Sequence, residues 1–213
     1  ALYYPGQVFE SAYQMVSFLV TAMMASMLTF IFAYRTRSQR DQLQVLASHD
    51  ALTGTRNRRA MNDELKIATS AFRRHGGHYA LLLMDLDHFK QINDRFGHQA
   101  GDQVLILFAE IIRQSCRQED RLFRFGGEEF LLLLPNTDGA GLLAAAEHLQ
   151  QQIAEHLRGP GGAVTVSMGG ARLRAGEHWE SWLQRADQRL YLAKAQGRNR
   201  IIMTDAIQPP APA

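Results

Sequence analysis

The sequence has little cysteine, little lysine and no strong excess of charge of either sign. Its single cysteine, Cys116, excludes an intrachain disulfide and any zinc site built from several thiolates. The 23 basic and 21 acidic residues nearly cancel, so bulk charge predicts no nucleic-acid partner. With 46% apolar residues, 213 residues suffice for one domain of ordinary size and a further segment. Function must therefore be sought in the placement of particular residues.

An uncharged stretch, residues 11–34, is long enough to span a bilayer. Three arginines follow it within residues 35–40, whereas Glu10 alone is charged before it, so the positive-inside rule predicts that everything downstream lies in the cytoplasm. A long buried helix of a soluble sensor or dimer stalk remains an alternative. A cleaved signal peptide is disfavoured because its basic residues would precede the apolar run. The chain starts at Ala1 rather than methionine, which suggests a cut inside a longer protein or a processed end.

The predicted organisation has four parts. Residues 1–34 form a periplasmic end and a transmembrane helix. Residues 35–49 form an amphipathic helical linker, whose Leu43 and Leu46 could pair with their copies or lie on a solvated connector. Residues 50–204 alternate long helical stretches with short apolar runs, which predicts an α/β domain. The Pro/Ala-rich tail, 205–213, is predicted to be disordered.

The α/β domain is predicted to contain five helices and five strands, without an internal repeat. The pair Gly126-Gly127 between two apolar runs predicts a hairpin, because glycine accepts the positive φ of tight turns. Predicted helices cover 57–74, 88–94, 99–116, 139–157 and 179–195, and predicted strands cover 79–86, 121–125, 129–134, 163–168 and 200–204.

Two pairs of acidic residues are candidates for the chemistry. Asp85 and Asp87 end the strand at 79–86, so they project from one sheet face where the strand leaves the core. Glu128 and Glu129 lie on the hairpin turn, and if the hairpin lies beside that strand, the acids converge on one ion. Hard carboxylate oxygens favour Mg²⁺ or Mn²⁺. Either pair alone is also typical of a solvated surface cluster.

Polar residues after these acids suit a nucleotide. The segment 88–102 turns into a short helix, where free backbone amides and Lys90 could hold a phosphate. Asn93 and Asp102 are residue types that can read a guanine edge, although each could equally cap a helix.

The end of the last helix offers two cations. Lys194 and Arg198 flank a glycine and could clamp the β- and γ-phosphates of a nucleotide. They could also merely compensate the helix dipole. Only three of the 23 basic residues are lysines, and two of those three lie among these proposed phosphate contacts, which favours binding.

Together these residues resemble one family, the GGDEF-domain diguanylate cyclases, which condense two GTP into cyclic di-GMP and release pyrophosphate. The resemblance covers about residues 48–202. It implies an α/β (α+β) fold with a palm-like sheet of nucleotidyl-cyclase type, mixed but mainly antiparallel and flanked by helices. Six ordered motifs carry it: Asp50–Arg59, Asp85–Lys90, Asn93–His98, Gly101-Asp102, Arg124–Phe130 and Ala193–Asn199.

The resemblance implies roles for individual residues. It assigns metal binding to Asp85, the Leu86 carbonyl and Glu128, and leaves Glu129, together with Glu128, for catalysis or a second metal position. Glu129 or a metal-bound hydroxide would act as the base. The implied contacts to GTP come from Phe89, Lys90, Asn93, Asp102, Lys194 and Arg198.

The implied reaction needs a homodimer. Each domain would hold one GTP, whose 3′-hydroxyl faces the α-phosphate of a GTP held by the partner domain, a geometry that one domain cannot close. The membrane helix and linker would then control how often two half-sites meet. The predicted location is the bacterial inner membrane, with the catalytic domain in the cytoplasm and no nucleic-acid partner.

A second site is suggested by Arg117 and Asp120. They form an Arg-x-x-Asp sequence six residues before Gly126, the position of the inhibitory site in the family, which binds the product cyclic di-GMP. A random Arg-x-x-Asp is usually only an exposed pair, so the offset from the hairpin carries the argument.

The sequence departs from the family pattern at three places. Thr55-Arg56 replaces a common Leu-Pro, Glu128 replaces an aspartate, and His88 stands where an aromatic residue is frequent. None of these removes a proposed ligand. A degenerate domain that only binds GTP or cyclic di-GMP remains the alternative, whereas a cyclase for adenine nucleotides is disfavoured because Asp102 would meet the acceptor N1 of adenine.

Overall fold

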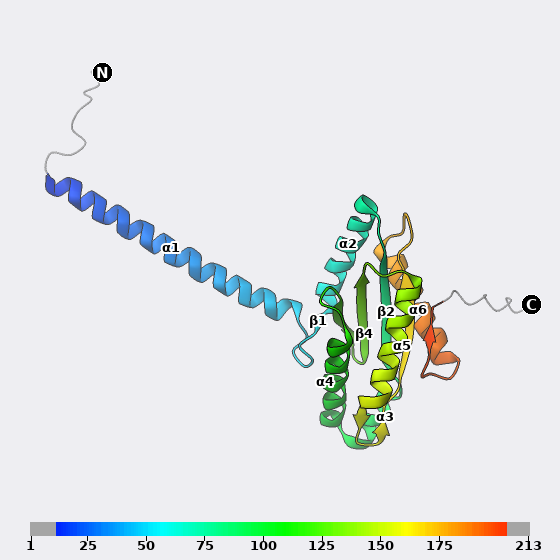
Figure 1. Cartoon of the computed structure of the whole chain (residues 1–213). Helices are drawn as coiled ribbons and strands as arrows, with labels where there is room; N and C mark the ends of the chain where they lie inside the picture. The colour runs from blue at the N-terminus through cyan, green and yellow to red at the C-terminus, as the bar shows by residue number, and fades with distance from the viewer. Residues whose placement is uncertain (1–11, 204–213) are drawn as a thin grey trace, which may run out of the picture. The chain divides into compact units, whose positions relative to one another are not determined.

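The computed structural model describes residues 12–203, with side chains at 13–35 and 48–203, in two units that divide after Ala47 (Figure 1). The predicted tail at 205–213 and the residues before Ala12 lie outside the described part, as do the linker side chains of Leu43 and Leu46.

Within residues 12–47 the first unit is one helix, α1 (Ala12–Ser48), whose last residue begins the second unit. It runs without interruption through the predicted boundary between span and linker, because no proline or glycine occurs in it. Its segment Tyr13–Arg35 is long and apolar enough to cross a membrane, and its large apolar side chains are exposed. A helix of this composition could span a bilayer by length alone.

The second unit is built on a six-stranded sheet in the order β1-β3-β4-β2-β7-β8. The central pairs β3–β4, β4–β2 and β2–β7 are antiparallel, and the outer pairs β1–β3 and β7–β8 are parallel. The mixed, mainly antiparallel sheet predicted from the resemblance is thus confirmed. The strands are β1 (Arg56–Asn57), β2 (Tyr79–Leu86), β3 (Arg121–Gly126), β4 (Glu129–Pro135), β7 (Val166–Arg172) and β8 (Ile201–Ile202), with a separate hairpin of β5 (Arg158–Gly159) and β6 (Gly162–Ala163).

Helices cover both faces of the sheet (Figure 1). Helices α4 (His98–Ser115) and α5 (Gly139–His156) pack on one face, and α2 (Arg58–His75) and α6 (Trp179–Ala195) pack on the other. The short α3 (Phe89–Phe96) connects β2 to α4.

Strand β2 lies at the centre and is buried on both sides. Leu82 and Met84 pack toward α4 and α5, whereas Leu81 and Leu83 pack toward α2 and α6. This double burial explains why the strand reads as a continuous apolar run rather than an alternating one. Each fully buried leucine contributes about 1.5–3 kcal/mol relative to exposure, so the strand ends are fixed by the core.

The predicted strand 163–168 is wrong in its bounds. The chain forms β6 at Gly162–Ala163 and then β7, which continues through Gly169-Gly170 to Arg172. A side chain at Gly169 would meet the backbone of α6, and one at Gly170 would meet Met203, so both glycines allow close packing inside the strand rather than ending it. The other predicted elements agree within two residues, and β1 and the β5–β6 hairpin were not predicted.

Candidate active site

The β3–β4 hairpin lies beside the end of β2, as the convergence of the acids requires. Asp85 of β2 faces Glu129 of β4 in the antiparallel register, and the Leu86 backbone N–H donates to the Glu128 carbonyl at 3.4 Å. The main chain therefore brings Asp85, Leu86 and both hairpin glutamates to one edge of the sheet.

Asp85 is buried at this edge and is paired with Lys194. The residue is 4% exposed, and its Oδ2 lies 2.6 Å from the Lys194 Nζ, which comes from the last turn of α6. Burial nevertheless raises the pKa of Asp85, and neighbouring Asp87 adds to the rise, although Lys194 opposes both. The solvated-cluster alternative is wrong for this pair, since Asp87 is equally buried.

The hairpin glutamates Glu128 and Glu129 lie in the same partly buried, negatively charged surroundings as Asp85. Burial raises the pKa of Glu128 and of Glu129, and the Asp85 charge raises both further against the opposing Lys194. Glu129 also feels Asp187 and Arg58, from the two helices on its face of the sheet. Carboxylates that repel one another in this way are stabilised by a bound cation.

The donor set fits Mg²⁺ or Mn²⁺ shared with a substrate. Among the described side chains, at 13–35 and 48–203, no group of three from His, Cys, Asp or Glu could hold a metal ion by itself. Mg²⁺ commonly takes one or two protein carboxylates and completes its shell with water and phosphate oxygens. Asp85, Leu86 and Glu128 line one pocket, where two carboxylates and a carbonyl are available for such a shell.

That pocket, of about 400 Å³, combines acids with cations. Its volume lies within the usual range for small-ligand sites. Lys90 comes from α3, and Lys194 and Arg198 come from the end of α6 and the turn after it. The lining residues are Asp85, Leu86, His88, Phe89, Lys90, Gln91, Asp94, Glu128, Lys194 and Arg198.

Asn93 and Asp102 lie on neighbouring helices, outside the lining of this pocket. Asn93 is inside α3, and Asp102 is in the second turn of α4, which Gly97 precedes as the N-cap residue. The helix-cap alternative is therefore wrong for both side chains. A Cβ at Gly101 would clash with the Asn93 side chain and press on the Phe89 ring, so this glycine lets α3 approach α4 next to Asp102.

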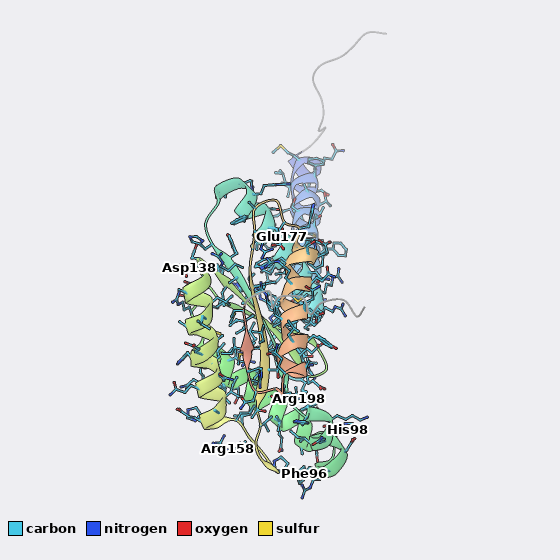
Figure 2. All side chains as sticks on the ribbon, turned by 90° about the vertical axis from the view of Figure 1, so that its right-hand side faces the viewer. Phe96, His98, Asp138, Arg158, Glu177 and Arg198 are labelled. Carbon is cyan, nitrogen blue, oxygen red and sulfur yellow. The ribbon has the colours of Figure 1, made fainter. Side chains whose placement is uncertain are left out.

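Arg117 and Asp120 line a second pocket, of about 520 Å³, at the other end of β2, where His78 precedes the strand. The Arg117 backbone N–H donates to Asp120 Oδ2 at 2.8 Å, whereas Asp120 Oδ1 is buried without a hydrogen-bond partner among the described residues. Burial raises the pKa of Asp120. His78 and His148 line the same pocket. Figure 2 shows Asp138, another lining residue, and Arg198 toward opposite ends of the domain.

The role of Arg124 was missed from the sequence. Its guanidinium lies 2.9 Å from Asp50 Oδ1 and also donates to the Gly127 carbonyl on the turn. Burial alone would raise the pKa of Asp50, but hydrogen bonds from Thr53 and Arg124 hold it below its ordinary value. Arg124 thus ties the start of the domain to the hairpin. Asp50 and Arg124 each open one of the family motifs, Asp50–Arg59 and Arg124–Phe130, and this was the only sequence signal for their role.

Thr55 and Arg56, which replace the common Leu-Pro of the family, both form contacts with nearby side chains. The Thr55 hydroxyl is buried and hydrogen-bonded to that of Thr53 at 2.9 Å, while Arg56 pairs with Glu64. Neither residue lines the pocket that contains Asp85 and Glu128, called the acidic pocket below.

Comparison with known proteins bears on this arrangement directly. The family model for the diguanylate cyclase GGDEF domain matches residues 47–200. The chain belongs to the GGDEF diguanylate cyclase family. The match covers both the acidic pocket and the Arg117–Asp120 pocket.

Curated relatives of this family are similar over the same region. Diguanylate cyclase DgcP of Pseudomonas aeruginosa is 43% identical over 155 residues, which cover 71% of this chain and 23% of the relative. Diguanylate cyclase DgcS of Shewanella oneidensis is 38% identical over 162 residues, covering 76% and 54%. The chain therefore spans about a quarter of the length of DgcP and about half of the length of DgcS.

Solved GGDEF structures share the fold. The coiled coil and GGDEF domain of DgcB from Caulobacter crescentus, in complex with c-di-GMP, matches with a TM-score of 0.80 at 32% identity, covering 87% of this chain and 99% of that one. The active GGEEF domain of a diguanylate cyclase from Vibrio cholerae matches with a TM-score of 0.66 at 34% identity, covering 69% and 96%. Both confirm the fold expected from the GGDEF resemblance.

Proposed function

We propose that this chain is a diguanylate cyclase that converts two GTP into cyclic di-GMP and two pyrophosphates. The observation that carries the proposal is one pocket that joins two carboxylates, Asp85 and Glu128, to the cations Lys194 and Arg198. Such a pocket suits a triphosphate with a divalent cation, because the carboxylates can bind the cation and the basic side chains can bind the phosphates. Family membership and the named cyclase relatives support the same activity.

In this proposal Asp85, the Leu86 carbonyl and Glu128 hold Mg²⁺ or Mn²⁺ with the substrate. The bound ion would supply charge neutralisation on the triphosphate. Lys90, Lys194 and Arg198 contact phosphate oxygens, whereas Asn93 and Asp102 read the guanine, with Phe89 packed beside them.

The chemical step joins two half-sites of a homodimer. The 3′-oxygen of one GTP attacks the α-phosphate of the GTP in the partner domain, and the bond to the β-phosphate oxygen breaks to release pyrophosphate. Glu129 accepts the 3′-hydroxyl proton. Its raised pKa suits that role, since a base works best when its pKa approaches the working pH. A second, identical step closes the ring.

Helix α1 is proposed as the membrane tether, with the GGDEF domain in the cytoplasm of a bacterial cell. Its exposed apolar side chains between Tyr13 and Tyr34 support this assignment, because such a surface is stable in lipid. Two copies held by such helices would meet at a rate set by the membrane segment.

The Arg117–Asp120 pocket is proposed as a product-inhibition site for cyclic di-GMP. Asp120 Oδ1 has no hydrogen-bond partner in the part of the chain that the structure describes and could accept from a guanine, while Arg117 could contact phosphate. The Caulobacter crescentus structures in complex with c-di-GMP support a ligand of this chemistry.

The test is incubation of the purified protein with GTP and Mg²⁺, followed by chromatography and mass analysis of the nucleotides. Cyclic di-GMP from the wild type, and none from Glu128→Ala or Glu129→Ala, is the expected result. No product from protein held dimeric by a fused zipper, together with cyclic di-GMP binding that depends on Arg117, would favour the receptor alternative.

A further inference from the structure

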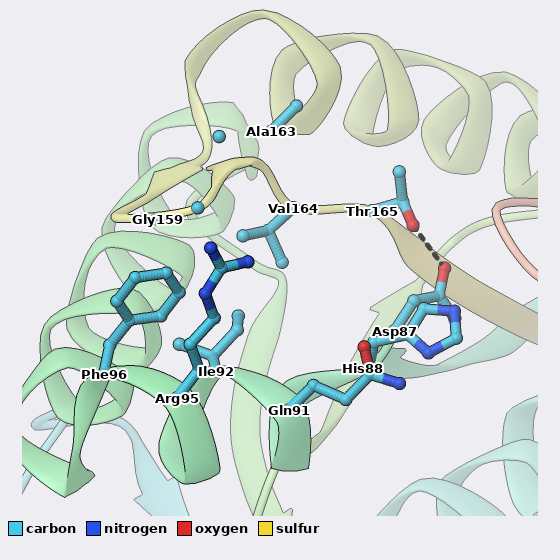
Figure 3. Close-up of a pocket in the computed structure, with 12 residues that line it drawn as sticks. Asp87, His88, Gln91, Ile92, Arg95, Phe96, Gly159, Ala163, Val164 and Thr165 are labelled. Carbon is cyan, nitrogen blue, oxygen red and sulfur yellow. Dashed lines mark hydrogen bonds between the residues drawn. The ribbon is translucent and has the colours of Figure 1, made fainter.

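Asp87 is a buried carboxylate just past β2 that contacts three hydrogen-bond donors. It is 4% exposed and accepts from the Ser167 hydroxyl at 2.6 Å, the Thr165 hydroxyl at 2.7 Å and the Asn199 backbone N–H at 3.0 Å. Figure 3 shows Asp87 bonded to Thr165 at the edge of a third, smaller pocket beside α3. Asp87 does not line the acidic pocket.

The Asn199 contact matters because of the backbone it holds. Gly197, Arg198 and Asn199 all have positive φ, at 111°, 60° and 45°. Left-handed conformations at non-glycine residues cost roughly 1–2 kcal/mol each and persist only where neighbours fix them. The Arg198 N–H donates to the Ala193 carbonyl at 3.0 Å, and the Asn199 carbonyl accepts from Gln150 at 3.2 Å.

We propose that Asp87 is a positioning residue: through the Asn199 N–H it fixes the strained turn 197–199, so that Arg198 faces the phosphates of the nucleotide. Asp87 itself does not contact the substrate. The proposal rests on the proposed function in one respect, that the pocket lined by Arg198 binds a triphosphate.

A purely structural role for Asp87 makes a different prediction. In that case its loss would weaken the fold and all ligand contacts alike, and loss of a neighbouring hydrogen bond would act in the same way. Ser167→Ala is the matched control, because it removes a donor from the same carboxylate but leaves the Asn199 contact on the other oxygen.

The experiment is a double-mutant cycle of Asp87→Ala and Arg198→Ala, measured by equilibrium binding of 3′-deoxy-GTP with Mg²⁺. This probe lacks the attacking hydroxyl, so binding is separated from turnover. Each single variant is expected to weaken binding roughly tenfold, and the double variant no more than either, since both remove the same phosphate contact. Binding of GMP, measured by competition, should change less than twofold.

Asp87→Asn keeps an oxygen that can accept from Asn199, so it should restore most of the affinity. If the alanine variant does not fold, Asp87→Leu takes its place in the cycle, because leucine fills a similar space and offers no acceptor to Asn199. Ser167→Ala should bind 3′-deoxy-GTP like the wild type. Additive losses in the cycle, or equal losses for GMP and the triphosphate, would overturn the positioning role. Normal coupling in a protein that makes no cyclic di-GMP would instead overturn the proposed function alone.

Discussion

Acidic residues on the two sides of the β3–β4 hairpin have pKa values that are shifted in opposite directions. On one side, Asp50 accepts from Thr53 and Arg124, and its pKa lies below the ordinary value. On the other, Asp85, Glu128 and Glu129 crowd together with Lys194, and the pKa of each acid is raised. The first side balances its charge within the chain, whereas on the second Lys194 offsets only part of the charge of three acids, which leaves that side uncompensated.

The difference separates residues that hold the hairpin from residues that act on a ligand. Satisfied charged hydrogen bonds stabilise the turn, whereas repulsion left among the acids is relieved only by a proton or a cation. Sites kept at a cost in stability are commonly functional, because a better-compensated residue there would remove the activity.

The largest expected effect is on the uncompensated side. Glu128→Gln keeps the shape of the side chain but removes a charge proposed to hold Mg²⁺, so cyclic di-GMP formation should fall by about 100-fold or more. The assay is product formation from GTP at saturating Mg²⁺. Activity within a few-fold of the wild type would place Glu128 outside the site.

The same reasoning extends to Asp120, whose raised pKa and unpartnered Oδ1 also mark an uncompensated acid. Asp120→Ala should weaken cyclic di-GMP binding by roughly tenfold or more, because a buried acceptor for guanine is lost. Titration calorimetry with the product measures this. Glu119→Ala is the control on the same turn and should bind normally, and an equal loss in both variants would count against the site.

On the compensated side the expected effect is on stability. Asp50→Asn should lower the free energy of unfolding by about 1–3 kcal/mol, since it weakens charged hydrogen bonds to Arg124 and Thr53. Glu64→Gln breaks the more exposed pair with Arg56 and should cost less than about 1 kcal/mol. Urea denaturation gives both values, and an equal cost would remove the special role of Asp50.

The pH dependence should have opposite signs on the two sides. Because the folded pKa of Asp50 is lowered, its contribution is present above the unfolded value and is lost as the pH falls through the folded pKa. The gap in stability between wild type and Asp50→Asn should therefore close in acid. For Glu128 the raised pKa means that the charged form destabilises the metal-free fold, so any advantage of Glu128→Gln near pH 7 should vanish as the pH falls. Denaturation curves at several pH values test both.

Much of this arrangement could be predicted where the signal is local. The apolar run of β2, the glycine turn and the spacing of the motifs located the acids and the cations in the chain. The Asp50–Arg124 pair could not be predicted in the same way, because its partners are 74 residues apart and no local pattern pairs the two motifs that contain them.

Two other features depend on packing that no local pattern encodes. Gly169-Gly170 reads as a strand breaker, yet both residues allow α6 and Met203 to approach β7. Asp87 reads as a partner of Asp85 for one ion, yet its hydrogen bonds go to Thr165, Ser167 and Asn199, and the last of these follows 112 residues later.

The most direct test compares thermal unfolding of metal-free Asp50→Asn and Glu128→Gln at pH 7. If the two sides differ as described, Asp50→Asn should unfold at a lower temperature than the wild type, and Glu128→Gln at the same or a higher temperature while losing cyclase activity. A fall in both unfolding temperatures would contradict the account, because Glu128 would then be a stabilising residue like Asp50.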